Sequence, residues 1–347
     1  MDHVGMDLGK RESQIAILTD DGELINMRIR TERHRLVEVF GRRPKAKIIV
    51  EASTESEWVA RCLEDLGHEV IVADPNYAPM YAQRTRRVKT DRRDAHALAH
   101  AGKAGTYRPA HRTSTERRDL RARLAVREAV VRTRAAWITR IQSLVRREGS
   151  RLRTGAPETF LTRVKELALP PTLTTVIAPL LELLGPLNKQ IAALDEELER
   201  IVAADEVTRP LTTVPGVGPV TATAFVATVD DVTRFRDAHQ VEAYLGLIPC
   251  EWSSSEAQRR GHITKAGNGR MRWLLVQAAW CILRRRKRPE TAALRDWADR
   301  IAGRRGRSIA AVALARRLAG ILFAIWRDGT VYDATKVRGP MTARRAA

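Results

Sequence analysis

Four carboxylates carry the most specific chemistry that the sequence offers. Asp7 lies in the middle of the first β-rich run, GMDLGK, and Glu51 ends the fourth, IIVEAS. Asp91 and Asp94, in KTDRRDA, are spaced i, i+3, which places both on one face of a helix. Clustered carboxylates repel one another unless divalent cations neutralise them, and hard oxygen ligands suit Mg²⁺ or Mn²⁺. Two such ions can activate one oxygen and stabilise another in an in-line displacement at phosphorus.

Each of these acids alone would more often be a cap or an ion-pair partner, and Lys89, Arg92 and Arg93 surround the last two. The order of a first-strand Asp, a fourth-strand Glu and then a helical Asp pair favours a joint site instead. This order resembles that of the RNase H-like nucleases of the Holliday junction resolvase type.

A serine cluster offers a second kind of chemistry. Ser253, Ser254 and Ser255 are consecutive, and a set of basic residues follows them: Arg259, Arg260, Lys265, Arg270 and Arg272. A serine hydroxyl is a poor nucleophile at neutral pH until a base or a metal ion takes its proton and cations hold the phosphate. The alternative interpretation of a serine run before a turn is a flexible loop or a helix cap.

A glycine-containing turn lies upstream of the serines, in LTTVPGVGPVTATAFVATV. Gly216 and Gly218 form the turn, and Pro219 suits the first turn of the following helix. The segment looks like a helix-hairpin-helix, in which backbone amides at a helix N-terminus meet a phosphate without reading bases. A plain helix-helix turn would have a similar sequence.

The net charge points to a polyanionic partner. Lysine and arginine number 61 against 41 aspartate and glutamate residues, a formal net charge of +20. The excess is local, because residues 84–153 contain 21 Lys or Arg but 6 Asp or Glu. A solvated face is the usual explanation of a charge run, but a helix with charge of one sign repels itself unless an anion lies beside it. We therefore predict nucleic-acid contact there, including at Arg117, Arg118 and Arg121.

The elements that must position these residues follow from periodicity. Over residues 3–74, short β-rich runs alternate with polar turns, and a helical stretch at 55–66 lies between the last two runs. This order of strands and helix predicts an α/β domain. Residues 77–103, which follow, look helical. The following stretch, 113–153, is predicted to be one long helix whose apolar seam includes Arg127 and Arg134.

A second long helix has an unbroken 3/4 spacing of apolar residues. Its seam consists of Ile177, Leu180, Leu184, Leu187, Ile191, Leu194, Leu198 and Ile201. The spacing predicts a coiled coil, either within the chain or between protomers. The alternative is an antiparallel helix pair packed on one domain.

Cysteine usage and hydropathy bound the cellular location. Cys62, Cys250 and Cys281 form no CxxC or Cys/His cluster, which supports neither a zinc site nor a disulfide framework and fits a reducing cytoplasm. The longest apolar stretch, 309–326, is interrupted by two adjacent arginines, so we expect no membrane span.

Taken together, the motifs resemble the DEDD transposases of the insertion-sequence family one-ten, including its sister one-eleven-eleven group, along nearly the whole chain. GMDLGK, IVEAS and KTDRRDA resemble that family's RuvC-like N-terminal domain. VPGVGPVTA and the specific pattern P-x-x-x-S-S-x(6)-G-x-I-T-K-x-G-N-x-x-x-R resemble its C-terminal transposase domain.

The resemblance implies a domain organisation. We expect an α/β RNase H-like (RuvC-like) DEDD domain at 1–105 and coiled-coil helices at 106–206. A mostly α-helical C-terminal transposase domain with a helix-hairpin-helix element is expected at 207–330. The remaining residues, 331–347, form a basic tail that we expect to be disordered.

The resemblance also implies an activity. The family cuts and rejoins DNA to move its own element, with Asp7, Glu51, Asp91 and Asp94 as the acids that bind Mg²⁺ or Mn²⁺. A structured RNA encoded in the element, the bridge RNA, guides the enzyme by pairing with donor and target DNA. We expect a homodimer or tetramer that acts in the bacterial cytoplasm at the nucleoid, without a membrane partner.

The resemblance further implies a serine that attacks DNA to form a covalent phosphoserine link. In the family this serine immediately precedes the glycine of an SSG sequence. Alignment on Pro249 and Gly261 makes the nucleophile Ser254, and Ser253 and Ser255 are less favoured candidates because Ser255 replaces the glycine here.

We predict that the acids and the serine form one composite site, in cis or across a dimer. In this hypothesis Arg259, Lys265 and Arg272 balance charge on the transition state, while Gly216, Gly218 and Arg270 also contact phosphates.

Two rival functions belong to other classes. A metal-dependent, Holliday-junction-resolvase-like nuclease would use water as its nucleophile and leave no protein-DNA adduct. A non-catalytic nucleic-acid-binding protein would bind without cleaving, but all four acids and the serine are present.

Overall fold

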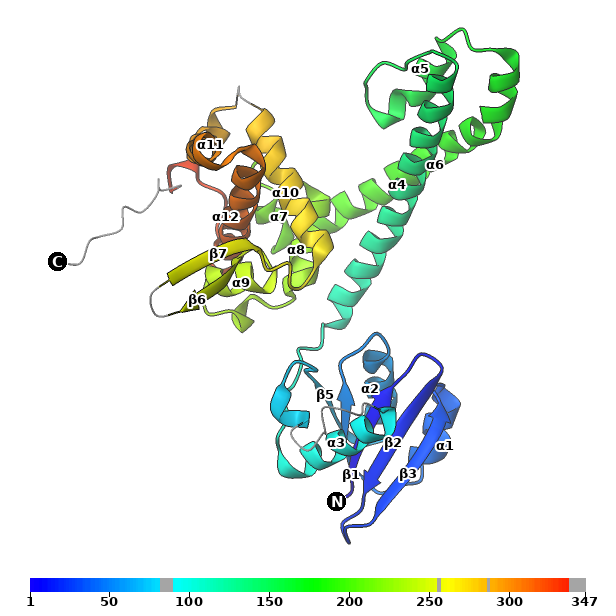
Figure 1. Ribbon diagram of the computed structural model, residues 1–347, viewed down its shortest axis with the longest axis vertical. Helices are drawn as coiled ribbons and strands as arrows, with labels where there is room; N and C mark the ends of the chain where they lie inside the picture. Colours follow the sequence, from blue (N-terminus) through cyan, green and yellow to red (C-terminus); the bar gives the residue numbers. More distant parts are fainter. Residues whose placement is uncertain (82–89, 255–256, 286–287, 337–347) are drawn as a thin grey trace, which may run out of the picture. The chain divides into compact units, whose positions relative to one another are not determined.

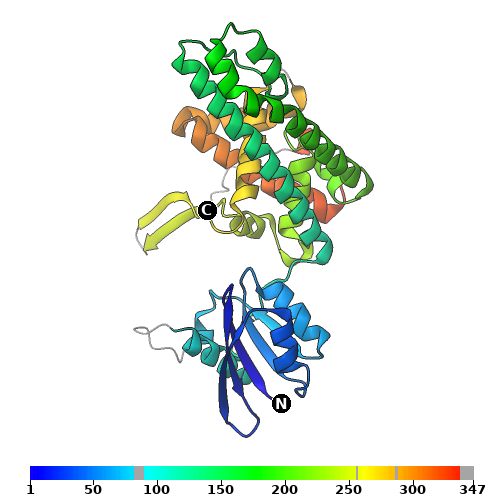
Figure 2. The same ribbon diagram turned by 90° about the vertical axis from the view of Figure 1, so that its right-hand side faces the viewer.

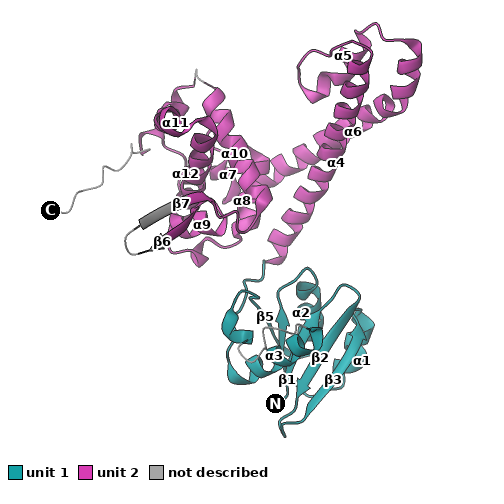
Figure 3. Ribbon diagram, in the orientation of Figure 1, with its two compact units in different colours: residues 1–113 teal, residues 114–347 magenta. Residues whose placement is uncertain are grey.

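The structure is a computed structural model that describes residues 1–81, 90–254, 257–285 and 288–336, with the backbone alone described at 253–254 and 257–260. It divides into two compact units, residues 1–113 and 114–347 (Figure 3). Each unit is described by itself below.

The first unit is built on a mixed five-stranded sheet with the strand order β3-β2-β1-β4-β5. The strands are β1 (His3–Leu8), β2 (Glu12–Leu18), β3 (Leu24–Arg30), β4 (Lys47–Glu51) and β5 (Glu69–Ala73). β1, β2 and β3 pair antiparallel, whereas β4 pairs parallel with both β1 and β5. The β-rich runs of the sequence therefore form an α/β unit, as the sequence predicts.

Helices cover both faces of this sheet because apolar residues alternate along its central strands. Val4 and Met6 face a core shared with α1 (Arg33–Phe40) and α2 (Ser56–Asp65). The opposite face packs against α3 (Asp91–Ala104), and a short 3₁₀ helix, η1 (Ala78–Tyr81), lies on the same side. α1 was not predicted from the sequence, and residues 82–89 of the expected helical stretch lie outside the described residues.

The second unit begins with two long helices, α4 (Thr115–Arg147) and α6 (Pro171–Ala204), joined through η2 (Pro157–Thr159) and α5 (Phe160–Lys165) (Figure 1). They run antiparallel within the chain, since residues early in α4 contact residues late in α6. Arg127 Nη2 lies 3.1 Å from Asp195 Oδ2. The seam arginines of α4 are thus paired with polar residues inside the same chain rather than left solvated.

The heptad seam of α6 is buried in this pairing. Every seventh residue of it is almost fully enclosed: Ile177, Leu184, Ile191 and Leu198. The intervening seam residues are half-buried. The helix continues through Pro179 and Pro186, and the contacts show a helix pair within the chain, one of the arrangements that the spacing allows.

The rest of the second unit is mostly helical. Its helices are α7 (Thr208–Leu211), α8 (Pro219–Val229), α9 (Ala238–Tyr244), α10 (Gly269–Arg284), α11 (Ala292–Arg305) and α12 (Arg307–Asp328), with η3 (Val232–Arg234), η4 (Pro289–Thr291) and η5 (Ala334–Lys336). A two-stranded antiparallel ribbon of β6 (Pro249–Ser254) and β7 (Ala257–Ile263) extends away from the helices (Figures 1 and 2). These two strands were not predicted from the sequence.

α12 is long and apolar enough to cross a membrane by length and composition. In the structure it is a core helix, because Leu314, Leu318 and Leu322 are fully buried among the residues of α8, α10 and α11.

The first part of the segment that we expected to be disordered, residues 331–336, is ordered and ends in η5. Tyr332 packs against this core, its backbone N–H donates to Thr213 Oγ1 at 2.9 Å, and its hydroxyl donates to the Glu290 carbonyl at 3.3 Å. Residues 337–347 lie outside the described residues.

Candidate functional site

Two of the predicted acids lie side by side at one edge of the first unit's sheet. β1 and β4 are parallel and in register, with Met6 opposite Val50, so Asp7 and Glu51 are the next residues on adjacent strands. Side chains alternate between the faces of a strand, so both carboxylates lie on the face covered by α3. The structure thus brings together an acid from the first strand and an acid from the fourth.

The helical pair lies at the start of α3, which crosses the same face. A Cβ added to Gly5 would come within 2.0 Å of the Ala95 carbonyl oxygen, so only glycine lets the helix backbone approach β1 this closely. Thr90 caps the helix by accepting a hydrogen bond from the Arg93 N–H. Asp91 and Asp94 lie in the first turn, but Asp91 is exposed whereas Asp94 is 3% exposed.

A tyrosine that the sequence analysis missed binds one of the acids. The Tyr81 hydroxyl donates a hydrogen bond of 2.6 Å to Glu51 Oε2. Within the described parts of the chain, no three His, Cys, Asp or Glu side chains come close enough together to hold a metal ion. The structure therefore brings together two of the four predicted acids, Asp7 and Glu51, whose oxygens are of the type that Mg²⁺ prefers, and within the described residues it does not gather Asp91 and Asp94 with them into one metal site.

The predicted nucleophile lies on the two-stranded ribbon of the second unit. Ser253 and Ser254 are the last residues of β6, and Ser254 pairs with Ala257 of β7. Their side chains, those of Arg259 and Arg260, and the whole of Ser255 lie outside what the structure describes.

The loop that follows the ribbon is fixed by backbone contacts. Gly267 adopts φ +64°, and a Cβ there would meet the Tyr244 carbonyl oxygen at 2.1 Å. Arg272 closes the loop by donating from Nη1 to the carbonyls of Leu245, at 3.1 Å, and Ala266. Arg272, which we predicted to contact phosphate, thus also stabilises the loop by binding two backbone carbonyls. Lys265 is exposed and adopts φ +57°, a left-handed conformation unusual for a residue with a Cβ.

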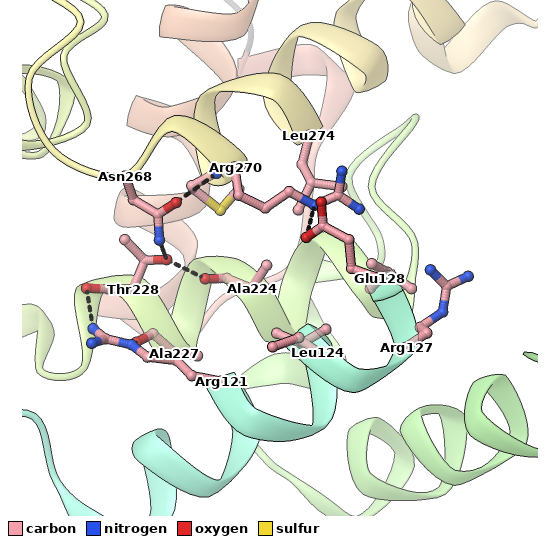
Figure 4. Close-up of a pocket in the computed structure, with 13 residues that line it drawn as sticks. Arg121, Leu124, Arg127, Glu128, Ala224, Ala227, Thr228, Asn268, Arg270 and Leu274 are labelled. Atoms are coloured by element: carbon pink, nitrogen blue, oxygen red, sulfur yellow. Dashed lines mark hydrogen bonds and ion pairs between the residues drawn. The ribbon is translucent and has the colours of Figure 1, made fainter. Parts of the chain in front are cut away.

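Two further motif residues join this loop to α4 and α8 (Figure 4). Asn268 caps α10 by accepting from the Met271 N–H at 3.1 Å, and its amide donates to Thr228 Oγ1 at 3.2 Å. Arg270 Nε lies 3.0 Å from Glu128 Oε2 on α4, and its guanidinium lies 4.3 Å from the ring centre of Trp273.

The Arg270 guanidinium is partly desolvated. Burial lowers the pKa of Arg270, whereas Glu128 raises it. The group stays charged at any physiological pH, because free arginine titrates far above neutrality. Its ion pair therefore ties α10 to α4 at neutral pH, which is a structural role beside the predicted phosphate contact.

The two glycines of the predicted phosphate-binding turn differ in their surroundings: one is packed against a helix and the other faces open space. Gly216 adopts φ +82°, and a Cβ there would lie 2.7 Å from the Ala278 carbonyl oxygen on α10, so this glycine is required by packing. Gly218 is the N-cap of α8, and no atom lies within 4 Å of the position of an added Cβ. Arg285 and Arg288 line the adjoining pocket. The turn thus presents an open helix N-terminus beside two cations.

The predicted arginines at the start of α4 also have partners within the unit. Arg117 Nη1 lies 3.6 Å from Asp205, and Arg118 donates to Thr115 Oγ1 at 2.9 Å. Arg121 Nε donates to the Ala227 carbonyl at 2.7 Å. Part of the basic charge therefore orients α4 against α6 and α8.

Sequence reasoning missed Tyr81, Glu128 and Trp252. Tyr81 and Glu128 act through partners distant in the sequence, and no local pattern marks them. Trp252 was visible in the sequence as an aromatic residue beside the serines, but its 61% exposure emerges only in the structure.

Comparison with known proteins finds two family domains in the chain. A DEDD family described as "Transposase" matches residues 4–148, and one described as "Transposase IS116/IS110/IS902 family" matches residues 208–295. These two matches identify the chain as a DEDD transposase, an enzyme class that cuts and rejoins DNA.

Similar proteins cover nearly the whole chain. A probable family 20 transposase of Pseudomonas aeruginosa is 29% identical, over 96% of this chain and 98% of its own length. The transposase for insertion sequence element IS1111A of Coxiella burnetii is 28% identical, over 93% of this chain and 88% of its own. That for IS1328 of Yersinia enterocolitica is 28% identical, over 95% and 98%. The chain belongs to the IS110/IS116/IS902 family of insertion-sequence transposases.

Proposed function

We propose that this transposase cuts DNA at a site formed by the acids of its first unit and joins it through Ser254. The observation that carries the proposal is the adjacency of Asp7 and Glu51 on the sheet face that α3 covers. The strand order β3-β2-β1-β4-β5 supports assignment of this unit to the RNase H-like (RuvC-like) fold.

Asp7 and Glu51 would hold Mg²⁺ or Mn²⁺, and Asp94 and Asp91 at the start of α3 would join them by a shift of their side chains, because no three of these acids lie close enough to share one ion in the described structure. Such an ion would polarise the scissile phosphate and lower the cost of deprotonating a hydroxyl beside it. Tyr81 orients the Glu51 carboxylate by donating to Oε2.

The second unit would bind the DNA backbone and supply the nucleophile. Lys265 supports this role, because it is an exposed cation held at a positive φ in a loop that is otherwise closed by Arg272. Backbone strain of this kind persists where the surrounding structure enforces it and clusters at functional sites. The open N-terminus of α8 at Gly218, with Arg285 and Arg288 beside it, suits a non-specific phosphate contact.

We also infer that an element-encoded guide RNA and a second copy of the chain complete the assembly in the cytoplasm. The high positive charge supports binding of more than one nucleic-acid strand. Val176 and Leu183, seven residues apart on α6, are 65% and 49% exposed and support a contact between protomers in a dimer or tetramer.

The test of the acidic site is an Asp7→Asn variant assayed for Mg²⁺-dependent cleavage of donor DNA in the presence of the element RNA. We expect cleavage to fall at least a hundredfold, roughly the loss of one catalytic electrostatic contact, while the variant still binds DNA. Asp21→Asn, in the exposed turn after β2, is the matched control and should cleave normally. Unchanged activity in Asp7→Asn would remove Asp7 from the site. Cleavage that never gives a protein-DNA adduct would favour the resolvase-like alternative.

A further inference from the structure

Trp252 is an exposed aromatic residue held in a fixed place on the ribbon that carries Ser254. Its side chain is 61% exposed, although a tryptophan is normally largely buried. The ring lies directly over Gly261 of β7: a Cβ added there would come within 2.5 Å of Cζ3 and 3.1 Å of Cη2. The His262 ring meets it edge-on, with ring centres 6.2 Å apart and planes at 83°.

Gly261 therefore has a specific structural role. Its backbone does not adopt a positive φ, so the conformation alone does not require glycine. Glycine is required at position 261 because any side chain there would displace the indole of Trp252. The displaced atoms belong to the end of a side chain on an exposed ribbon, so a Cβ would move the ring without disrupting the core.

Other tryptophans of the unit are covered differently. Arg270 lies 4.3 Å above the ring of Trp273, and Arg317 lies 4.8 Å above that of Trp297. Trp252 instead rests on a glycine and leaves most of its surface open to solvent. An apolar, flat and pre-oriented surface of this kind is suited to stacking, and every nucleic-acid base has a face that can occupy it.

We propose that the indole of Trp252 stacks on an unpaired base of the DNA strand next to the phosphate that Ser254 attacks. This inference rests on the proposed role of Ser254. The two residues are two positions apart on β6, a backbone span of about 7 Å, so a base held by one lies within a nucleotide or two of a phosphate at the other. Arg259 pairs with Trp252 across the ribbon. The proposed stacked nucleotide therefore lies beside the backbone of a basic residue.

The test measures the affinity of the full-length protein for a fluorescein-labelled twelve-nucleotide oligo(dT) by fluorescence anisotropy. Trp252→Leu should bind about five- to 150-fold more weakly, the loss expected when one base loses its aromatic partner. Trp252→Phe should bind within about threefold of the unaltered protein, because a phenyl ring still stacks. Trp273→Leu is the matched control, an exposed tryptophan already covered by Arg270, and should also stay within about threefold.

Gly261→Ala separates positioning from simple loss of the ring. It should weaken oligo(dT) binding as Trp252→Leu does, and it should add nothing in the Trp252→Leu background, because both changes remove the same contact. Equal losses in Trp252→Leu and Trp273→Leu, or additive losses for Gly261→Ala and Trp252→Leu, would overturn the proposal. A loss confined to oligo(U), with oligo(dT) binding unchanged, would assign the surface to RNA and overturn it for DNA.

Failure of this inference is distinguishable from failure of the proposed function. Ser254→Ala should bind oligo(dT) normally, since the stacking surface remains. If Trp252→Leu binds oligo(dT) normally while Ser254→Ala loses its DNA adduct, the stacking proposal is wrong and the serine assignment stands.

Discussion

The Tyr81 hydroxyl donates a hydrogen bond of 2.6 Å to Oε2 of Glu51, which lies next to Asp7 at the sheet edge. Thirty positions separate Tyr81 from Glu51 in the sequence. They meet because η1 packs on the sheet face that α3 covers, and the Glu51 side chain lies on that same face. A carboxylate at the end of a strand can otherwise adopt several rotamers. The contact fixes one of the acids that we propose as metal ligands.

Tyr81→Phe should therefore weaken Mg²⁺ use without unfolding the protein. Residues that orient metal ligands typically change metal affinity or activity by about ten- to a hundredfold when removed. We expect the Mg²⁺ concentration for half-maximal DNA cleavage to rise about tenfold, measured by titration at fixed DNA and RNA. A Tyr77→Phe variant, altered in the segment just before η1, controls for loss of a nearby hydroxyl. An unchanged Mg²⁺ requirement in Tyr81→Phe would show that Glu51 does not need this contact.

The antiparallel pairing of α4 and α6 can be tested on two adjacent residues. Leu184 is 1% exposed in the seam, whereas Leu183 is 49% exposed on the other side of α6. Leu184→Ala should lower the free energy of unfolding by about 2–5 kcal/mol through cavity formation. At a protein concentration at which the chain is monomeric, Leu183→Ala should change it by less than about 0.5 kcal/mol, because the proposed contact with a second protomer is then absent. Urea denaturation of both variants checks this, and equal effects would mean that the seam does not face α4.

Lys265 should contribute to DNA binding, and its strained backbone conformation should cost some stability. Lys265→Gly relieves the positive φ, so we expect the free energy of unfolding to stay level or rise by up to about 1 kcal/mol. DNA affinity should fall, and the slope of log affinity against log salt should decrease by about one unit, because one phosphate contact is lost. A variant with an unaltered salt slope would show that Lys265 does not contact phosphate.

The first unit should lose stability in mild acid through His96. Burial is the main reason why the pKa of His96 lies below its ordinary value of 6.5, and Arg92 and His100 lower it further. The unfolded chain therefore takes up a proton first as the pH falls through about 6.5, and protonation favours unfolding. His96→Gln keeps a side chain that can bond to Asn26 but cannot titrate. Its urea midpoint should fall less than that of the unaltered protein between about pH 7.5 and pH 5.5. Parallel pH profiles would contradict this.

Local periodicity predicted the parts of this fold that depend on neighbouring residues. The β-rich runs became the five-stranded sheet, and the spacing of apolar residues placed α4 and α6, although the first was expected to run to residue 153 and ends at Arg147. The same spacing could not choose between a pairing within the chain and one between protomers. That choice depends on contacts such as Arg127 with Asp195, which lie 68 residues apart.

The site could be predicted in part for the same reason. The sequence placed Asp7 and Glu51 on strands, and the two acids are adjacent because β1 pairs with β4, a pairing that the alternation of elements allows but does not fix. The ribbon that carries Ser254 was not predicted, because the segment around it lacks the alternation of apolar and polar residues that marks a half-buried strand. The packing of the Trp252 ring on Gly261 is a contact between two strands that no local sequence pattern encodes.

The central claim is that Ser254 forms a covalent bond with DNA, and one gel tests it most directly. Purified protein, element RNA, labelled donor and target DNA and Mg²⁺ are incubated and then separated under denaturing conditions. We predict a labelled protein-DNA adduct that is absent in Ser254→Ala and retained in Ser253→Ala. An adduct that persists in Ser254→Ala, or DNA cleavage with no adduct in the unaltered protein, would contradict the assignment of Ser254 as the nucleophile.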